Sequence, residues 1–256
     1  MNQPLFRDQF LVLWRRYFAG AELPLAMYFS SSPGDVPLAR FTDASRCFVG
    51  DLILVRRGKP RAFTLNCVGC QGGKRYLGFT QNLRDYLPYF LSYGIEGELE
   101  GERYKKTPEI AQQAIESAPL FHAPAPYLIC KRWDQLNDSD QPELAVFYAT
   151  PDVLAGLFTL ANYDQSETSA VIAPFCAGCG AIVLHPYKQR ESENPKAILG
   201  MFDLSARPYI EENCLTLAMP IEKLHSMTAN TEESFLITRT WKRMRRRIEK
   251  TSDFEG

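Results

Sequence analysis

Four of the cysteines stand in two C-x-G-C motifs, Cys67 with Cys70 and Cys176 with Cys179. A C-x-x-C turn brings two sulfurs close enough to chelate one metal ion. Two such turns supply four thiolates, the donor set of tetrahedral zinc and of iron–sulfur clusters. The same residues suit a redox dithiol or simple burial, because a free cysteine packs like a small apolar side chain. The motifs are 109 positions apart, so a shared site depends on the fold.

Each motif follows a similar run of elements. The first copy has apolar stretches typical of strands at 25–29 and 62–66, with a helical stretch between them. The second copy has the same pattern at 144–148 and 170–174. Strand-helix-strand units favour parallel pairing through right-handed crossovers, and sites in such sheets form beyond the carboxyl ends of strands. We therefore expect both cysteine turns to meet at carboxyl ends.

The predicted fold class is α/β, as one globular domain over residues 1–256. Two pseudo-symmetric β-α-β-CxxC units, 25–79 and 144–202, form its body. An amphipathic helix at 4–18 and a C-terminal helix at 231–250 flank it, since apolar residues recur in both at helical spacing.

Three further elements are expected at the end of the first unit and in the connection to the second. Residues 74–79 predict a short strand and residues 81–93 a helix. Residues 108–117 predict a second helix, because Thr107-Pro108-Glu109 offers a cap, a proline at the first helical position and an acid in the first turn.

Further motifs surround the cysteines. They are Cys176-Ala-Gly-Cys-Gly180, Pro195 to Asp203, Ser205-Ala206-Arg207, Met227 with Asn230, and Glu233-Ser234-Phe235 with Trp241. Together with Cys67, Gly72-Gly73 and Leu77-Gly78-Phe79, they resemble the family numbered 169 in the domain-of-unknown-function series. The resemblance covers most of the chain. The recurring cysteines of that family imply metal binding, which the resemblance carries to Cys67 and Cys179.

Basic residues and glycines near the predicted strand ends suggest a second kind of site. The candidates are Lys74, Lys196, Arg207, Gly72 and Gly73. Amides of a glycine loop can meet an anion, and Arg207 could hold a carboxylate or phosphate through its planar fork. Alternatively, Arg207 pairs with Asp203 and holds a turn. The second hypothesis is therefore a non-catalytic binding module for a small anionic metabolite, with structural cysteines.

The remaining cysteines and histidines have no partners in the sequence pattern. Cys47, Cys130 and Cys214 stand in apolar surroundings and are predicted to be packing residues. His185 follows the second motif closely and is a candidate ligand, although packing is the commoner role of such a histidine. His122 and His225 are given no role.

Composition narrows the class of protein. The net charge of −1 gives no global attraction to nucleic acid or acidic surfaces. No apolar run reaches the ~20 residues of a membrane span, and the N-terminus lacks the layout of a signal peptide. A cytoplasmic location with no membrane partner is expected. Seven cysteines, an odd count in a reducing compartment, argue against a disulfide framework.

The run from Lys242 to Arg247 contains five bases. We expect its helix to begin at Thr231, which places Glu232 and Glu233 in the first turn and the bases at the end. That order suits the helix dipole, and no aromatic residues interleave as a stacking platform for bases. The sequence therefore favours a solvated helix end and no nucleic-acid partner.

No Walker loop, G-x-G-x-x-G motif or nucleophile–base pair is present in the sequence. The leading prediction is a cytosolic protein of unknown activity with a cysteine-bound metal or iron–sulfur centre that serves a redox or small-molecule reaction. Its cofactor is expected to be zinc or an iron–sulfur cluster. The predicted ligands are Cys67, Cys70, Cys176 and Cys179.

Overall fold

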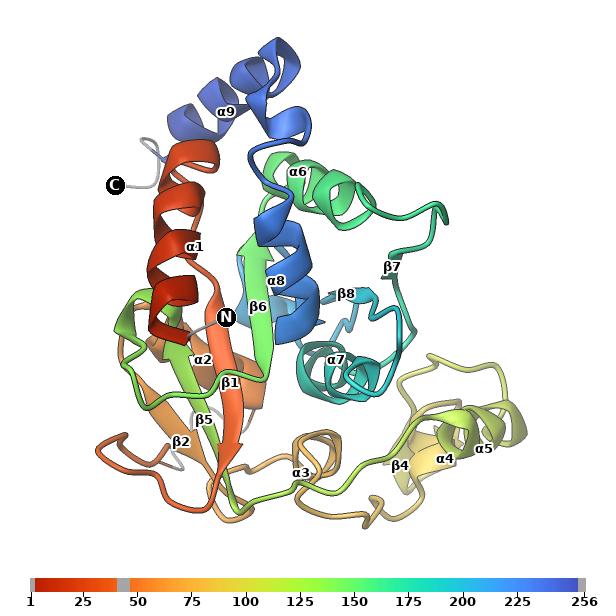
Figure 1. Cartoon of the computed structure of the whole chain (residues 1–256). Coiled ribbons are helices and arrows are strands. Elements are labelled where there is room, and N and C mark those ends of the chain that lie inside the picture. The colour runs from red at the N-terminus through yellow and green to blue at the C-terminus, as the bar shows by residue number, and fades with distance from the viewer. Residues whose placement is uncertain (1–2, 41–46, 253–256) are drawn as a thin grey trace.

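A seven-stranded mixed sheet forms the centre of the molecule (Figure 1). The computed structural model describes residues 3–40 and 47–252. The strand order is β2-β5-β1-β6-β9-β8-β7. The strands are β1 (Leu25–Ser30), β2 (Arg61–Phe63), β5 (Tyr127–Arg132), β6 (Leu144–Ala149), β7 (Val171–Ile172), β8 (Ala197–Gly200) and β9 (Leu215–Pro220). A separate two-stranded sheet pairs β3 (Gly94–Ile95) with β4 (Leu99–Glu100).

Pairing in the large sheet is mainly antiparallel. Among the named strands in residues 3–40 and 47–252, β7 and β8 pair in parallel and the other pairs are antiparallel. The predicted direct pairing of the two strands of the first unit is wrong, because β5 lies between β1 and β2 and pairs antiparallel with both, although β1 and β2 themselves run in the same direction. A long connection returns the chain to the sheet after β2, and β5 takes the place beside β1. Apolar patterning marks a strand but leaves its partner and direction open.

The predicted pseudo-symmetry of the two units holds for the order of the strands and not for the helices. Outward from the β1–β6 pair, the strand order is similar on both sides: β5 and β2 on one, β9 and β8 on the other. The helices break this likeness. Helix α2 (Phe48–Arg56) packs with Leu25 and Met27, whereas α6 (Pro151–Ala161) packs with Ala26 on the opposite face. The sheet and helices confirm a mixed α/β fold, and the β-α-β-CxxC repeat is not confirmed.

The other helices agree with the prediction in part. They are α1 (Gln3–Tyr17), α3 (Gln71–Tyr76), α4 (Leu87–Phe90), α5 (Pro108–Ser117), α7 (His185–Gln189), α8 (Ile221–Ala229) and α9 (Arg239–Ser252), with a π-helix η2 (Gly180–Leu184). Helix α5 begins as predicted, with the Thr107 side chain accepting a hydrogen bond from the Ile110 amide. The predicted strand at 74–79 is wrong: Lys74 and Leu77 close helical turns onto Cys70 and Gly73. Most of the predicted helix at 81–93 is irregular, and only α4 is helical there.

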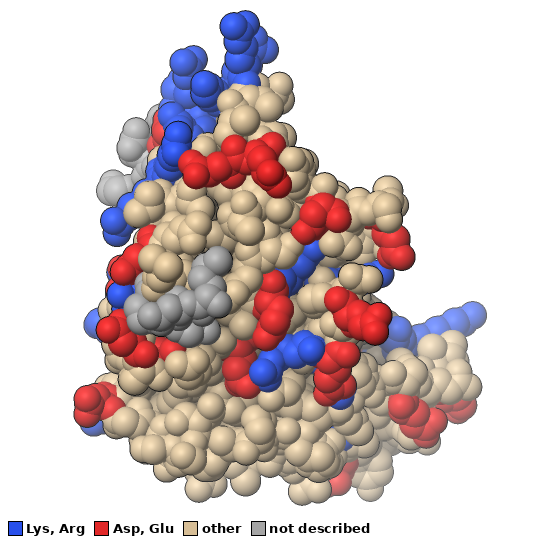
Figure 2. All heavy atoms as spheres, in the orientation of Figure 1, with Lys and Arg blue, Asp and Glu red and all other residues tan. Residues whose placement is uncertain are grey.

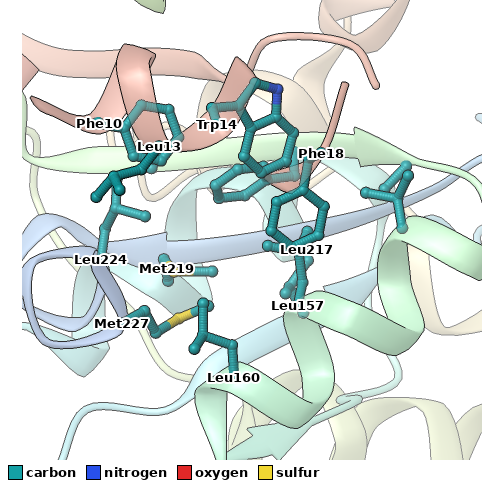
Figure 3. Packing of buried hydrophobic residues seen from close by; sticks show 14 of the residues in the cluster. Phe10, Leu13, Trp14, Phe18, Leu157, Leu160, Leu217, Met219, Leu224 and Met227 are labelled. Atoms are coloured by element: carbon teal, nitrogen blue, oxygen red, sulfur yellow. The ribbon is translucent and has the colours of Figure 1, made fainter. Parts of the chain in front are cut away.

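An aromatic stripe on α1 packs against one face of the sheet (Figure 3). Phe10, Trp14 and Phe18 follow one another at four-residue intervals and therefore share a helix face. The rings of Trp14 and Phe18 stack at 4.5 Å, and Trp14 lies 5.2 Å from the Phe147 ring on β6. Burial of this stripe fixes the N-terminal helix on the sheet.

The C-terminal helix begins at Arg239 rather than at Thr231. Residues 235–237 form a short 3-10 turn, which Ser234 caps by accepting a hydrogen bond from the Leu236 amide. Trp241 and Ile248 are buried, and the Trp241 indole donates to the Tyr17 carbonyl at 2.8 Å. No helix in residues 3–40 and 47–252 is long and apolar enough to cross a membrane.

A buried ion pair ties the loop before β6 to the sheet. The Lys131 ammonium lies 2.8 Å from both carboxylate oxygens of Asp140, and both side chains are less than a tenth exposed. Asp140 also accepts hydrogen bonds from the Tyr28 hydroxyl and the Asn137 amide. These hydrogen bonds satisfy both carboxylate oxygens of Asp140. The carboxylate in turn compensates the positive charge of Lys131, which could not otherwise remain buried.

Replacing Asp140 with Asn should therefore lower the free energy of unfolding by about 3 kcal/mol, because the buried Lys131 charge loses its counter-ion. Urea unfolding measures the change. The control is Asp138→Asn, which removes an exposed partner of Arg7 and should cost less than about 1 kcal/mol. Equal losses in the two variants would show that the buried pair contributes no more than a surface contact.

Candidate functional site

The two C-x-G-C turns meet, although they follow strands at opposite edges of the sheet. Strands β2 and β7 are the two edge strands. The successive strand pairings across the sheet make these two strands run in opposite directions. Their carboxyl ends therefore cannot form one row, which corrects the predicted placement. The turns meet instead on the face covered by α2, where Cys179 lies in the core and the half-buried Cys67 packs against it.

Close backbone contact joins the two segments. Helix α3, after the first turn, packs against η2, after the second. A Cβ atom on Gly180 would lie 3.1 Å from the Tyr76 ring and 3.5 Å from the Cys176 Cβ. A Cβ on Gly178 would lie 3.1 Å from the Met201 sulfur. The glycines therefore allow the second turn to approach its neighbours closely.

Electrostatic coupling identifies which cysteines lie together. Burial raises the pKa of the Cys179 thiol well above its ordinary value. Negative charge on Cys70, Cys47 and Cys176 raises it further. These four residues, Cys47, Cys70, Cys176 and Cys179, are called the cysteine cluster below. Cys179 is buried, Cys47 and Cys176 are half-buried and Cys70 is exposed, so the cluster extends from the core to the surface.

Cys47 is the member of the cluster that the sequence analysis assigned to packing. It directly precedes α2, at the position where the backbone enters the helix. Burial raises its pKa, hydrogen bonds from the Gly50 and Val49 amides lower it, and charge on Cys70 raises it. Nothing in the linear sequence links it to the two motifs.

Cys67 has a different environment from the cluster. Its sulfur accepts a hydrogen bond from the Thr64 hydroxyl at 3.3 Å, and its side chain packs against the core on the α2 face. The predicted role of Cys67 as a metal ligand stays a prediction.

Asp203 holds the second turn in place. Its Oδ2 accepts a hydrogen bond from the Gly178 amide, inside the C-x-G-C motif, at 2.9 Å. Its Oδ1 accepts from the amide and hydroxyl of Ser205. Two residues before it, Met201 is buried with a φ of +73°, a left-handed conformation that non-glycine residues seldom adopt. The strained backbone places the Asp203 carboxylate beside the turn.

Two of the predicted anion ligands, Arg207 and Lys196, donate hydrogen bonds to other groups of the protein. The Arg207 guanidinium donates to the carbonyls of Cys214 and Glu212, so it holds the loop before β9. The Lys196 ammonium donates to the Ser169 hydroxyl at 3.1 Å. The sequence analysis considered an Arg207–Asp203 pair. The structure joins the two residues through the backbone, from the Arg207 amide to the Asp203 carbonyl.

The remaining predicted anion ligands belong to α3, directly after the first turn. Gly73 lies under Val68, where a Cβ would be only 2.9 Å from the valine side chain, and Gly72 lies beside the Cys70 sulfur. The two glycines thus allow close packing within the first turn. Lys74 contributes its amide to the first helical bond of α3. Anion binding by Lys74, Gly72, Gly73, Lys196 and Arg207 stays a prediction.

Residues of the long connection between α3 and β5 reach the rim of the cluster. The Lys105 ammonium lies 4.2 Å from the centre of the Phe175 ring, next to Cys176 in sequence. The pKa of Tyr104 is raised to about 12, first by burial and then by Glu102, with Asp203 adding to the effect. This connection therefore forms one side of the surface around the second turn.

The donor set and the side-chain positions give different answers on metal binding. Thiols are the ligands that zinc and iron–sulfur clusters prefer, and the cluster supplies four of them beside a carboxylate. Within the part of the chain that the structure describes, however, no group of three His, Cys, Asp or Glu side chains is disposed to hold a metal ion as it stands. The chemistry of the donors fits a soft metal, whereas their present side-chain positions do not.

A family model matches most of the chain. The model of the DUF169 family, described as Uncharacterised ArCR, matches residues 20–230, a range that contains all four cluster cysteines and Cys67. No match was found among curated proteins or among solved structures.

The thiol of Cys176 should make the stability of the reduced, metal-free protein depend on pH. Burial, with Asp203 in second place, raises its pKa from 9.0 to about 12. The folded state therefore keeps a proton that the unfolded chain releases above pH 9. The stabilisation is fully present below pH 9 and is lost as the pH rises towards 12, by about 1 kcal/mol at pH 10.

Urea unfolding at pH 8 and pH 10 measures this loss. Cys176→Ala should lose about 1 kcal/mol less between the two pH values than the unaltered protein, because alanine has no proton to release. Parallel pH dependence in the two proteins would contradict the assigned shift.

Proposed function

The chain belongs to the DUF169 family, and we propose that its cysteine cluster binds a thiophilic metal ion or an iron–sulfur cluster. One observation carries the proposal. Two C-x-G-C turns, 109 positions apart and following oppositely directed edge strands, come together with a further cysteine at one place. Packing alone gives no reason for sulfur from three separate segments to gather there.

The electrostatics of the cluster favour a bound cation over a reactive thiol. A redox or nucleophilic cysteine needs a depressed pKa, which nearby cations or helix N-termini supply. Here burial raises the pKa values of Cys47, Cys176 and Cys179, and Asp203 adds negative charge beside all three. A metal ion supplies the positive charge that thiolate ligands require.

Each residue of the cluster has a distinct part in the proposed site. Cys179 would supply the buried ligand, and Cys47, Cys70 and Cys176 would close the site towards solvent. A cysteine side chain has a single torsion to its sulfur, so rotation about that torsion is the adjustment that binding requires. Asp203 acts through the backbone, since it fixes the Gly178 amide between two of the ligands.

Metal analysis after anaerobic purification tests the proposal. About one zinc per chain, or iron together with acid-labile sulfide, is the expected result. Cys179→Ser and Cys70→Ser should lose the metal, because each removes a thiolate. Cys130→Ala is the control, since Cys130 is buried on β5 outside the cluster. Unaltered metal content in both serine variants, or metal-free protein that cannot be reconstituted, would refute the proposal.

A matched pair of variants identifies the fourth ligand. Cys47→Ser should reduce the bound metal, whereas Cys67→Ser should retain it, because charge on Cys47 raises the pKa of Cys179 while the Cys67 sulfur accepts a hydrogen bond from the Thr64 hydroxyl. The reverse result would restore the ligand set that the sequence motifs predict and would exclude Cys47.

Replacing Asp203 with Ala should weaken metal binding by roughly 10- to 100-fold without changing the number of metal ions per chain, as is usual when a residue that orients a ligand is lost. Competition with a chelator measures the affinity. Ser205→Ala serves as the control, since Ser205 contacts the other carboxylate oxygen and not the cysteine turn. If Asp203→Ala binds metal as tightly as the control does, Asp203 does not position the turn.

A further inference from the structure

The C-terminal helix concentrates positive charge that the rest of the chain lacks. Helix α9 contains seven lysines and arginines and one glutamate, a net charge of +6. The whole chain has a net charge of −1, so the remainder carries −7. In Figure 2 the bases gather at the end of the molecule where Figure 1 places α9. Such segregation indicates a partner of opposite charge.

The helix dipole does not explain why bases occur at the start of α9. The dipole favours acids in the first turn and bases in the last, and its effect falls off within one turn. Helix α9 has no acid in its first turn and begins with Arg239, where a base is unfavourable. Glu232, which the sequence analysis placed inside the helix, lies before it and pairs with Arg16. The dipole therefore accounts for Lys250 but not for the bases nearer the start.

Five of the bases form a single exposed stripe, defined here as Arg239, Lys242, Arg243, Arg246 and Lys250. Lys242 and Arg243 are adjacent and the other successive members are three or four residues apart, so all five fall along one side of the helix. None of the five side chains has an acidic partner among the residues that the structure describes. Two other bases of α9 are paired: Arg247 with Asp152 at 3.0 Å and Arg245 with Glu249 at 3.1 Å.

The opposite side of α9 is already packed into the molecule. Trp241 and Ile248 are 3% and 4% exposed. A Cβ on Gly156 of α6 would lie 2.3 Å from the Trp241 ring, so the indole rests directly on the α6 backbone. An amphipathic helix binds a membrane by inserting its apolar side. That side of α9 is occupied, which leaves only the charged stripe for a partner.

We infer that the stripe on α9 binds the phosphate backbone of double-stranded nucleic acid. The stripe is about 16 Å long, and phosphates recur about every 3.4 Å along the axis of each strand. Three of its five members are arginines, whose planar forks match phosphate oxygens. The stripe contains no aromatic side chain, so it lacks the stacking surface that single strands require. Binding is therefore to the backbone of a duplex and independent of base sequence.

This inference is independent of the cysteine cluster, and its test uses the full chain as purified. Fluorescence anisotropy with a labelled 20-base-pair DNA duplex should give a dissociation constant in the range of about 1–10 µM at 50 mM salt. With about five phosphate contacts, affinity should fall roughly 500-fold between 50 and 200 mM salt.

A pair of double variants locates the contact. Arg243→Gln with Arg246→Gln should weaken duplex binding roughly 10- to 100-fold at 100 mM salt and make the salt dependence shallower by about two phosphate contacts. Arg84→Gln with Lys106→Gln removes the same charge from exposed positions beside α4 and α5, away from α9 (Figure 1), and should leave binding unchanged. Circular dichroism checks that both variants are folded.

Three results would overturn the inference. These are no duplex binding at 50 mM salt, equal losses in the two double variants, or tighter binding of a single strand of the same length. Binding of anionic lipid vesicles in the absence of duplex binding would likewise overturn it, because a lipid surface would then be the partner.

Discussion

The meeting of the two C-x-G-C turns on the α2 face is the constraint on which the site depends. The edge strands that precede the turns run in opposite directions at opposite sides of the sheet. The chain must therefore travel across one face from both edges to bring Cys70 and Cys179 together. Glycines at 178 and 180 permit the close approach, and the Asp203 carboxylate fixes the Gly178 amide. Burial of Cys179 and the negative groups around it raise the pKa of its thiol, so the thiol stays protonated. A bound cation would compensate the negative charge of the thiolates.

The sequence predicted most of the elements because local patterns determine them. Helix α5 and strands β1 and β6 lie close to their predicted positions, since capping residues and apolar runs act locally. The pairing of strands was not predictable in this way. Strand β5 enters between β1 and β2 from a distant part of the chain, and β-propensity does not specify a partner. The predicted strand at 74–79 failed for a related reason: residues 71–76 form a helix that packs against η2, and that contact is not visible in the sequence.

The candidate site was predictable in type but not in membership. Cysteines spaced as C-x-G-C identify themselves, and three of the four predicted ligands lie in the cluster. Cys47 has no motif around it and reaches the cluster only because α2 packs over the sheet. The C-terminal helix shows the same limit. The helix begins eight residues later than predicted, so Glu232 and Glu233 lie outside the helix that they were expected to stabilise. The helix dipole then no longer accounts for its distribution of charges.

X-ray absorption at the edge of the bound metal tests the central claim most directly, because it counts and identifies the atoms around the ion. If the cysteine cluster binds the metal, the first shell consists of sulfur alone, with four sulfurs at about 2.3 Å in the case of zinc. A first shell dominated by nitrogen or oxygen at about 2.0–2.1 Å would contradict the account, since His, Asp or Glu side chains would then hold the metal and the convergence of the two turns would serve packing alone.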